Sequence, residues 1–302
     1  MKILVTGGAG FIGSNLCETI AAEHDVTVYD NLSLGSRDNL KAVKDSLKIV
    51  RGDILDRKIR SMKCDTIVHL AGASSAPMFM PDPSKGLNTN INGFVNVLEC
   101  AKANGAVLIY ASTSSIYGNN PVPLREDQMV TPPNFYSVSK LTMENLAYIY
   151  NVNYGVSSAG LRFMSVYGPH ERSKGKFANL VSQFMWWMLE GKSPVIYGDG
   201  NQKRDFTYVK DIVQAIMLLL EAKGSEIYNV GTNKAYSLNQ LVGVLNKVMG
   251  TDIRPEYIEN PMKNYIMTQL ADITKIGKLG YKPRYTLENG IRECFDYYRV
   301  RR

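Results

Sequence analysis

The sequence predicts a doubly wound α/β fold, in which helices cover both faces of a parallel sheet, followed by a smaller C-terminal α/β domain. Short apolar runs alternate with longer amphipathic segments through the first half of the chain, and a glycine-rich turn follows the first apolar run. This alternation is typical of parallel sheets, because each helix returns the chain to the same edge. The less regular second half predicts a smaller domain packed over the carboxyl edge of that sheet.

Strands and helices alternate regularly up to about residue 150. Apolar runs predict strands at 2–6, 26–29, 48–50, 66–70 and 107–111, and amphipathic segments predict helices at 13–23, 85–104 and 134–150. Pro132 and Pro133 precede the last of these helices, and proline suits a helix entrance because its φ angle is already helical.

The second half predicts helices at 177–190, 211–221 and 238–249, and strands at 194–197 and 227–230. A last helix is expected to begin at Thr286, a good N-cap residue, because apolar residues follow at helical spacing at positions 287, 291, 295 and 298.

Composition and charge exclude several classes of protein. The net charge of +7 comes from dispersed residues without interleaved aromatics, so we expect an anionic small-molecule substrate rather than nucleic acid. No apolar run reaches the roughly 18–20 residues of a membrane span, and glycines interrupt the apolar start before a signal peptide can form. The four scattered cysteines form no CxxC motif, so no metal site or disulfide framework is expected and a cytoplasmic location fits.

The segment TGGAGFIG at 6–13 follows the first predicted strand and opens the first predicted helix. Gly7 permits a tight turn, Gly10 lets backbone approach a pyrophosphate, and Gly13 lets the helix pack on the strand. The unpaired N–H groups at the helix start then face the phosphates. Glycines at this spacing between a strand and a helix predict a dinucleotide-binding turn.

Asp30 ends the second strand about 20 residues after the glycines, where an acid is expected to bond the adenosine ribose. Its carboxylate would repel a 2′-phosphate, so NAD is favoured over NADP. Arg37 is interpreted as a solvated loop residue rather than a partner for that phosphate. Two interpretations of Asp53, which follows the third strand, stay open: contact with the adenine amino group, or a helix cap.

Tyr136 and Lys140 lie four residues apart in YSVSK, so their side chains share one face of the predicted helix. A free tyrosine has a pKa of about 10, and a nearby lysine cation together with the positive nicotinamide ring favours the phenolate. Tyr136 is then able to take a proton from a substrate hydroxyl while hydride passes to NAD. Lys140 is also placed to bond the nicotinamide ribose.

A run of hydroxyl residues, ASTSSIYG at 111–118, follows the fifth strand directly. One of these hydroxyls is expected to hold the substrate hydroxyl beside Tyr136. The alternative is a turn whose hydroxyls satisfy their own backbone, and both interpretations hold if they concern different residues.

Ordered motifs run along the whole chain: TGGAGFIG at 6–13, YDNLS at 29–33, GDI at 52–54, HLA at 69–71, STSSIYG at 112–118, YSVSK at 136–140, LR at 161–162, VYGP at 166–169 and RDF at 204–206. On these motifs the chain resembles the extended short-chain dehydrogenase/reductases, and among them UDP-glucose 4-epimerase and related NDP-sugar epimerases. The resemblance implies an NAD-binding Rossmann domain at 1–164 with a return segment near 205–232, and a nucleotide-sugar-binding domain at 165–302.

The resemblance also implies roles for individual residues. Tyr136 is implied as the base, Lys140 as its activator, and Thr113, four residues before the YG tyrosine, as the hydroxyl partner. The implied NAD-binding residues, besides Tyr136 and Lys140, are Gly7, Gly10, Phe11, Ile12, Gly13, Asp30, Asn31, Ser33, Gly35, Ser36, Asp53, Ile54, Leu70, Ala71 and Gly72. The implied substrate-binding residues are Thr113, Ser165, Asn179, Arg204, Lys263 and Tyr265.

Asn179 is implied to hold the nucleotide and Arg204 to clamp the diphosphate, because a planar guanidinium suits two-pronged contacts. The alternative for Arg204 is an ion pair with Asp205 or Asp211. Ser165 departs from the family pattern, which has asparagine there. Lys263 is a candidate substitute for a second diphosphate arginine, which aligns near the preceding residue.

The residues within the hydroxyl run differ between family members that catalyse different reactions. Sugar dehydratases carry Asp-Glu after the threonine and decarboxylases carry Glu at the second of these positions, whereas this chain has Ser114 and Ser115. The resemblance therefore implies an NAD-dependent NDP-sugar epimerase of the UDP-glucose/UDP-galactose 4-epimerase type, acting through tightly bound NAD and a 4-keto intermediate. The alternative is an NAD-dependent dehydrogenase or reductase of the same fold, acting on another NDP-sugar or a small alcohol. A homodimer through the helices near 85–104 and 134–150 is implied by the resemblance alone.

Overall fold

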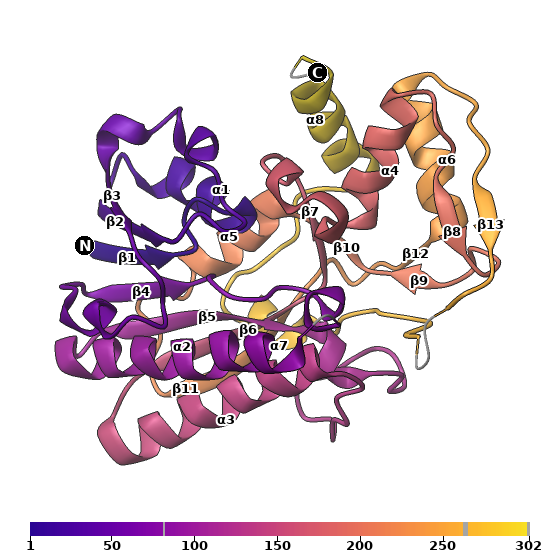
Figure 1. The fold of residues 1–302 in the computed structure, drawn as a ribbon. Helices are drawn as coiled ribbons and strands as arrows, with labels where there is room; N and C mark the ends of the chain where they lie inside the picture. Colours follow the sequence, from indigo (N-terminus) through magenta and orange to yellow (C-terminus); the bar gives the residue numbers. More distant parts are fainter. Residues whose placement is uncertain (81, 262–264, 301–302) are drawn as a thin grey trace.

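The computed structural model confirms the α/β fold class, and it describes residues 1–80, 82–261 and 265–300. Seven parallel strands form the main sheet in the order β11-β6-β5-β4-β1-β2-β3 (Figure 1). The strands are β1 (Lys2–Thr6), β2 (Asp25–Asp30), β3 (Leu47–Arg51), β4 (Thr66–His69), β5 (Val107–Thr113), β6 (Ser158–Phe163) and β11 (Ser225–Val230). The order reverses direction beside β1, which is where open α/β sheets bind ligands.

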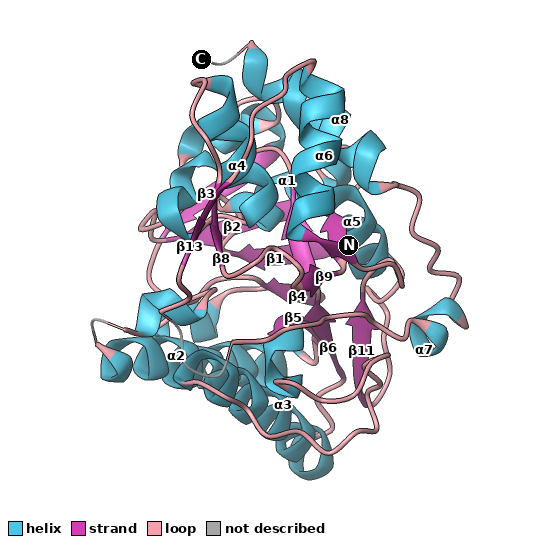
Figure 2. Ribbon diagram, turned by 90° about the vertical axis from the view of Figure 1, so that its right-hand side faces the viewer, coloured by secondary structure: helices cyan, strands magenta, loops and turns pink. Residues whose placement is uncertain are grey.

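Helices cover both faces of this sheet, as Figures 1 and 2 show. The helices α1 (Phe11–Ile20) and α5 (Val209–Met217) pack on one face, and α2 (Pro83–Asn104) and α3 (Phe135–Tyr154) pack side by side on the other. Along β1, Ile3 and Val5 belong to the first core and Leu4 to the second. Because successive strand residues face opposite sides, both faces are apolar and β1 reads as one continuous apolar run.

The strand β6 is absent from the sequence prediction, although all six of its residues are buried and it lies between β11 and β5. Polar residues near both ends of β6 interrupt the run of apolar residues that predicts a buried strand. Ser158 hydrogen-bonds Ser225 on β11, with 3.0 Å between the two hydroxyl oxygens. Arg162 is buried against Glu144 of α3, with an N–O distance of 2.7 Å.

A third core lies over the carboxyl edge of the sheet and is built from helices, with short strand pairs around it. The helices are α4 (Leu180–Leu189), α6 (Leu238–Met249) and α8 (Leu287–Arg299), and α7 (Thr274–Gly277) packs near β11. The strand pairs are β7 (Ser165–Tyr167) with β10 (Phe206–Tyr208), β9 (Lys203–Arg204) with β12 (Tyr236–Ser237), and β8 (Val195–Tyr197) with β13 (Glu256–Ile258). The predicted domain boundary at 164/165 stays a prediction.

Two predicted helices of the second half begin at other residues. The helix predicted at 177–190 begins at Leu180, because Asn179 caps it by accepting a hydrogen bond from the Val181 N–H at 3.0 Å. The helix predicted at 211–221 is α5 at Val209–Met217, so Asp211 lies inside its first turn. Within the described part of the chain, no helix is both long and apolar enough to span a membrane.

A buried polar network joins β5, β6 and α3 beneath the carboxyl edge of the sheet. Glu144 accepts hydrogen bonds from the Arg162 guanidinium and from the Ser112 hydroxyl. The Tyr117 hydroxyl accepts from Arg162 at 2.7 Å and donates to Asn229 at 2.9 Å. The network neutralises the arginine charge inside the core, which makes a buried ion pair tolerable.

We predict that Arg162→Ala lowers the free energy of unfolding by about 3–5 kcal/mol, because it leaves the Glu144 carboxylate buried without its partner. Chemical denaturation of the wild type, Arg162→Ala, Glu144→Ala and the variant with both changes measures this effect. The double variant should cost clearly less than the sum of the two single changes. Additive costs would show that the pair is not coupled.

Candidate active site

A cavity of about 920 Å³ opens at the carboxyl edge of the sheet. It runs along the ends of β1, β2, β4, β5 and β6 and reaches the loop before α4. Its walls include the predicted cofactor residues Gly7, Gly10, Phe11, Ile12, Gly13, Asp30, Asn31, Ser33, Gly35, Asp53, Ile54, Leu70, Ala71 and Gly72, and the predicted reacting residues Thr113, Tyr136 and Lys140. The two groups of residues therefore share one cavity.

The glycine turn between β1 and α1 is built around close backbone contacts. Gly7 has a φ angle of +71°, and a β-carbon there would lie 2.6 Å from the Ala71 nitrogen. A β-carbon at Gly13 would overlap the Gly7 carbonyl oxygen. A β-carbon at Gly10 would have one near atom among the described residues beyond its chain neighbours, which is that same oxygen at 3.1 Å, so the other side of Gly10 is open.

No side chain caps the start of α1 at Gly10, so the first N–H groups of this helix stay available beside the cavity. An uncapped helix start next to a residue without a side chain suits a pyrophosphate, which accepts hydrogen bonds from such N–H groups. These residues fit the diphosphate of a dinucleotide.

Asp30 is buried at the cavity wall. Its two carboxylate oxygens accept hydrogen bonds from the N–H groups of Ala9 at 3.0 Å and Leu32 at 2.7 Å. Burial raises the pKa of Asp30, and the two backbone hydrogen bonds act against this rise. Each oxygen keeps a further lone pair, so the carboxylate fits the ribose hydroxyls of NAD.

The structure shows the local contacts of Asp53, Ser36 and Arg37. Asp53 lines the cavity and accepts hydrogen bonds from the Asn31 amide at 2.8 Å and the Leu55 N–H at 2.9 Å. The helix cap is Asp56 instead, so that interpretation of Asp53 is wrong. Ser36 is not part of the cavity wall but caps the short helix Arg37–Leu40, and Arg37 is exposed.

Tyr136 and Lys140 lie in the first two turns of α3, which Asn134 caps as predicted for a helix that opens there. The Lys140 ammonium donates to the Ala111 carbonyl at 2.8 Å, so it lies against the end of β5. Burial lowers the pKa of Lys140 to about 8. Burial also raises the pKa of Tyr136, and a hydrogen bond with Thr113 acts in the opposite direction.

The hydroxyl residues after β5 have different partners, so some bond within the protein while another lies beside Tyr136. Ser112 points into the core and binds Glu144, whereas Ser114 accepts a hydrogen bond from the Gln269 amide at 3.0 Å. The Thr113 hydroxyl accepts from the Ser115 N–H at 3.1 Å and also reaches Tyr136. Thr113 is therefore the hydroxyl that the backbone holds beside the phenol.

A second cavity of about 330 Å³ adjoins the first beside the start of α4. Ser165 and Asn179 line both cavities, and Arg204 lines the second. The predicted substrate-binding residues Ser165, Asn179 and Arg204 therefore lie together. Lys263 lies outside the described residues.

Arg204 is not in an ion pair, so the alternative of a salt bridge with Asp205 or Asp211 is wrong within the described residues. Asp205 is saturated by Thr232, Asn233 and Ala271, and Asp211 accepts from two backbone N–H groups. The guanidinium donates to the carbonyls of Lys203 and Met267 at 2.8 and 3.3 Å. The Tyr265 ring lies 5.2 Å from it and outside both cavity walls, so Tyr265 supports Arg204 rather than facing the cavity.

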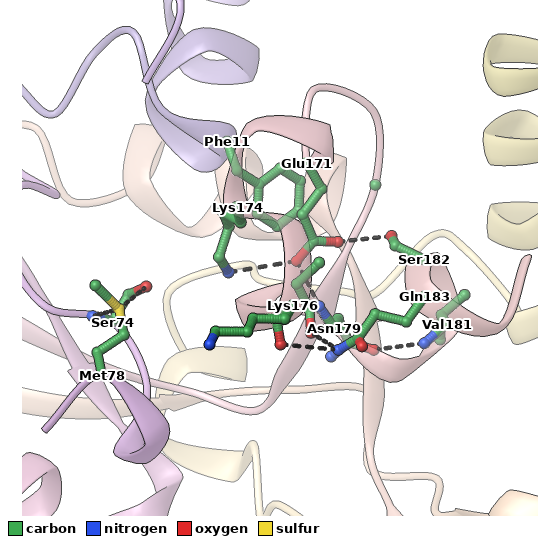
Figure 3. A network of polar contacts seen from close by, with 12 residues as sticks. Phe11, Ser74, Met78, Glu171, Lys174, Lys176, Asn179, Val181, Ser182 and Gln183 are labelled. Atoms are coloured by element: carbon green, nitrogen blue, oxygen red, sulfur yellow. Dashed lines mark hydrogen bonds and ion pairs between the residues drawn. The ribbon is translucent and has the colours of Figure 1, made fainter. Parts of the chain in front are cut away.

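One loop of the site was missed by the sequence analysis, which placed 177–179 in a helix and assigned no role to the residues before it. The fully buried Glu171 accepts from the Asn179 N–H at 2.7 Å, the Ser182 hydroxyl at 2.6 Å and the Lys174 ammonium at 3.3 Å (Figure 3). Lys174 and Phe177 line the larger cavity. The only signal was the local density of lysine and glycine after VYGP.

A parallel sheet whose ligand cavity has a dinucleotide turn at one end and a Tyr-Lys pair at the other defines a dehydrogenase/reductase type of enzyme. The chain belongs to the NAD dependent epimerase/dehydratase family, whose model matches residues 3–231. NAD is accordingly its cofactor.

Three relatives illustrate the breadth of the family. UDP-glucuronate 4-epimerase of Thermodesulfobacterium geofontis is 33% identical, over 97% of this chain and 95% of that protein. A UDP-N-acetylglucosamine 4-epimerase of Methanobrevibacter ruminantium superposes with a TM-score of 0.95 at 32% identity, over 100% of this chain and 99% of that one. UDP-glucose 4-epimerase of Thermotoga maritima gives 0.93 at 32% identity, over 100% and 99%. The likeness establishes an enzyme of NDP-sugars without fixing the sugar.

We predict that Gly10→Ala weakens NAD binding by about tenfold or more, because the added methyl group occupies the open side where backbone and pyrophosphate approach. The NAD content of the purified protein and a titration of stripped protein measure this. Fold should be retained, since the φ and ψ angles of Gly10, −79° and −175°, suit alanine.

The matched control is Gly243→Ala in the middle of α6, where an added β-carbon meets nothing within 4 Å. It should leave NAD binding unchanged and stabilise the helix by roughly 0.5–1 kcal/mol. Equal NAD binding by the Gly10 variant and the wild type would contradict the assignment of the turn.

Proposed function

We propose that the protein is an NAD-dependent nucleotide-sugar 4-epimerase of the UDP-glucose/UDP-galactose type. The observation that carries this proposal is the continuity of the two cavities. Tyr136, Thr113 and Lys140 line the larger one, and Arg204 lies in the smaller one, with Asn179 on the wall of both. If Arg204 binds the anionic diphosphate of the substrate, the attached sugar extends toward Tyr136.

The reacting groups of this chain suit reversible removal of a proton from a sugar hydroxyl. Bound NAD supplies a hydride acceptor that can return what it takes. Tyr136 takes the hydroxyl proton in the same step, and Thr113 bonds the sugar oxygen beside it. Burial disfavours the phenolate of Tyr136, and the hydrogen bond with Thr113 favours it. In the proposed reaction, the Lys140 cation and bound NAD lower the cost of the phenolate further.

Inversion requires that the 4-keto sugar turn about its diphosphate and receive hydrogen on the other face. Ser114 and Ser115 offer no acid to eliminate a neighbouring hydroxyl, and Ser114 is bonded to Gln269. This supports epimerisation over dehydration. A firm hold on the nucleotide and a loose hold on the sugar would allow the turn.

The test is incubation of the purified protein with UDP-glucose, UDP-galactose, UDP-glucuronate and the N-acetyl derivatives, without added NAD, with chromatography of the products. We expect interconversion of at least one pair of 4-epimers. Tyr136→Phe should lower kcat by at least about 100-fold, because general base catalysis contributes roughly 10²–10⁴.

Circular dichroism and NAD content serve as controls, and both should match the wild type in the Tyr136 variant. Stoichiometric NADH formation on addition of NAD and an alcohol or NDP-sugar, without epimer formation, would identify a dehydrogenase instead. Full activity of Tyr136→Phe would contradict the proposed mechanism.

We further propose that the protein is a homodimer through α2 and α3, in the cytoplasm. The outer face of α3 exposes several apolar side chains: Phe135, Val138, Tyr148, Ile149, Val152 and Tyr154. Exposed apolar side chains on a long helix are typical of a surface that packs against another helix. All four cysteines are free thiols, which supports a reducing compartment.

Light scattering should therefore give twice the chain mass of 33.7 kDa. The double change Ile149→Glu and Val152→Glu should give the mass of one chain, because it places two charges among the exposed apolar side chains of the C-terminal half of α3. Met129→Glu, at a side chain that is 91% exposed and outside α3, is the control and should remain dimeric. A wild-type protein with the mass of one chain would refute the dimer.

A further inference from the structure

The second cavity has a marked imbalance of charge. Two cationic side chains line it, Lys176 and Arg204, and its described lining residues include no aspartate or glutamate. Asn179, the N-cap of α4, lies on the same wall, so the positive end of the helix dipole adds to the two side chains. A cavity of this kind favours an anion with more than one negative charge.

Neither cation is neutralised by the described part of the chain. Among the described residues, no ion pair involves Lys176 or Arg204. Lys174, two residues earlier, differs because its ammonium is held by the buried Glu171 at 3.3 Å. The two lysines of the loop are therefore not equivalent, and Lys176 is the one whose charge is available.

The backbone around Lys176 is fixed although its side chain is exposed. The Gln183 amide donates to the Ala178 carbonyl at 2.7 Å and to the Lys176 carbonyl at 3.4 Å. Gly175, with a φ angle of +51°, turns the chain immediately before it. Figure 3 shows the Lys176 side chain extending from this loop toward Ser74 and Met78, which line the larger cavity.

We propose that Lys176 binds the diphosphate of the nucleotide sugar together with Arg204, as a further cation of that subsite. This inference rests on the proposed function. A diphosphate carries more than one negative charge, and a single guanidinium leaves part of it uncompensated. Lys176 supplies a further positive charge from the segment that also carries Asn179. In this proposal the same segment therefore binds both the nucleotide and its phosphates.

Lys176 is a binding residue in this account and takes no part in proton transfer. Its loss should raise KM for the nucleotide sugar and leave kcat unchanged, because the diphosphate is held equally in the ground state and the transition state. This separates it from Tyr136, whose loss lowers kcat.

Calorimetric titration with UDP, ADP and dTDP, and with the nucleoside of whichever binds most tightly, tests the inference. Lys176→Ala should weaken that diphosphate by about tenfold at low salt, and less at high salt. Binding of the nucleoside should not change. Lys176→Arg, which keeps the charge, should restore binding to within about twofold of wild type.

Lys223→Ala, at an exposed lysine outside both cavities, changes the net charge equally and should bind as the wild type does. If Lys176→Ala binds the diphosphate as tightly as the Lys223 control, the inference is overturned while the proposed function stands. If the wild-type protein binds none of the three diphosphates, the proposed function fails as well.

Discussion

The close approach of backbone at the β1–α1 turn is the constraint on which the site depends. Gly7 and Gly13 leave no room for β-carbons against Ala71 and the turn itself, so α1 begins directly above the sheet edge with its N–H groups uncapped. The same contact places Gly7 against the loop after β4, and that loop joins the cavity wall. The place for the cofactor diphosphate is therefore set by backbone packing at this turn and does not depend on a side chain.

The helix α3 connects this cofactor end to the reacting end. Tyr136, Lys140 and Glu144 are spaced four residues apart, so they lie along one face of the helix. Glu144 is anchored to Arg162 in the core, and Lys140 lies one turn nearer the cavity against β5. A buried ion pair beneath the site thus fixes the register in which the phenol meets Thr113. The stability of the core and the geometry of the reacting groups rest on the same helix.

The sequence predicts what depends on local pattern and misses what depends on distant partners. Continuous apolar strands and the glycine turn are local, so most of the sheet and the residues that line the glycine-turn end of the cavity could be predicted. The strand β6 could not, because Arg162 looks unsuited to a core until Glu144 is placed beside it. The start of α4 could not be placed from the sequence because the turn at Gly175 has no apolar pattern. For the same reason, nothing in the sequence indicated that the lysines of this loop lie at the site. Tyr265 lies behind Arg204, an arrangement that spacing along the chain cannot reveal.

In the proposed epimerase, the hydrogen removed from the sugar returns to the same sugar molecule. A mixture of the interconverted nucleotide sugar deuterated at C4 and the same compound uniformly labelled with ¹³C in its sugar tests this directly by mass spectrometry of the product. We expect deuterium only in the product without ¹³C, with no transfer to the ¹³C-labelled product and no release to solution. Deuterium in the ¹³C product, or in free NADH, would contradict an epimerase that retains its cofactor and its intermediate.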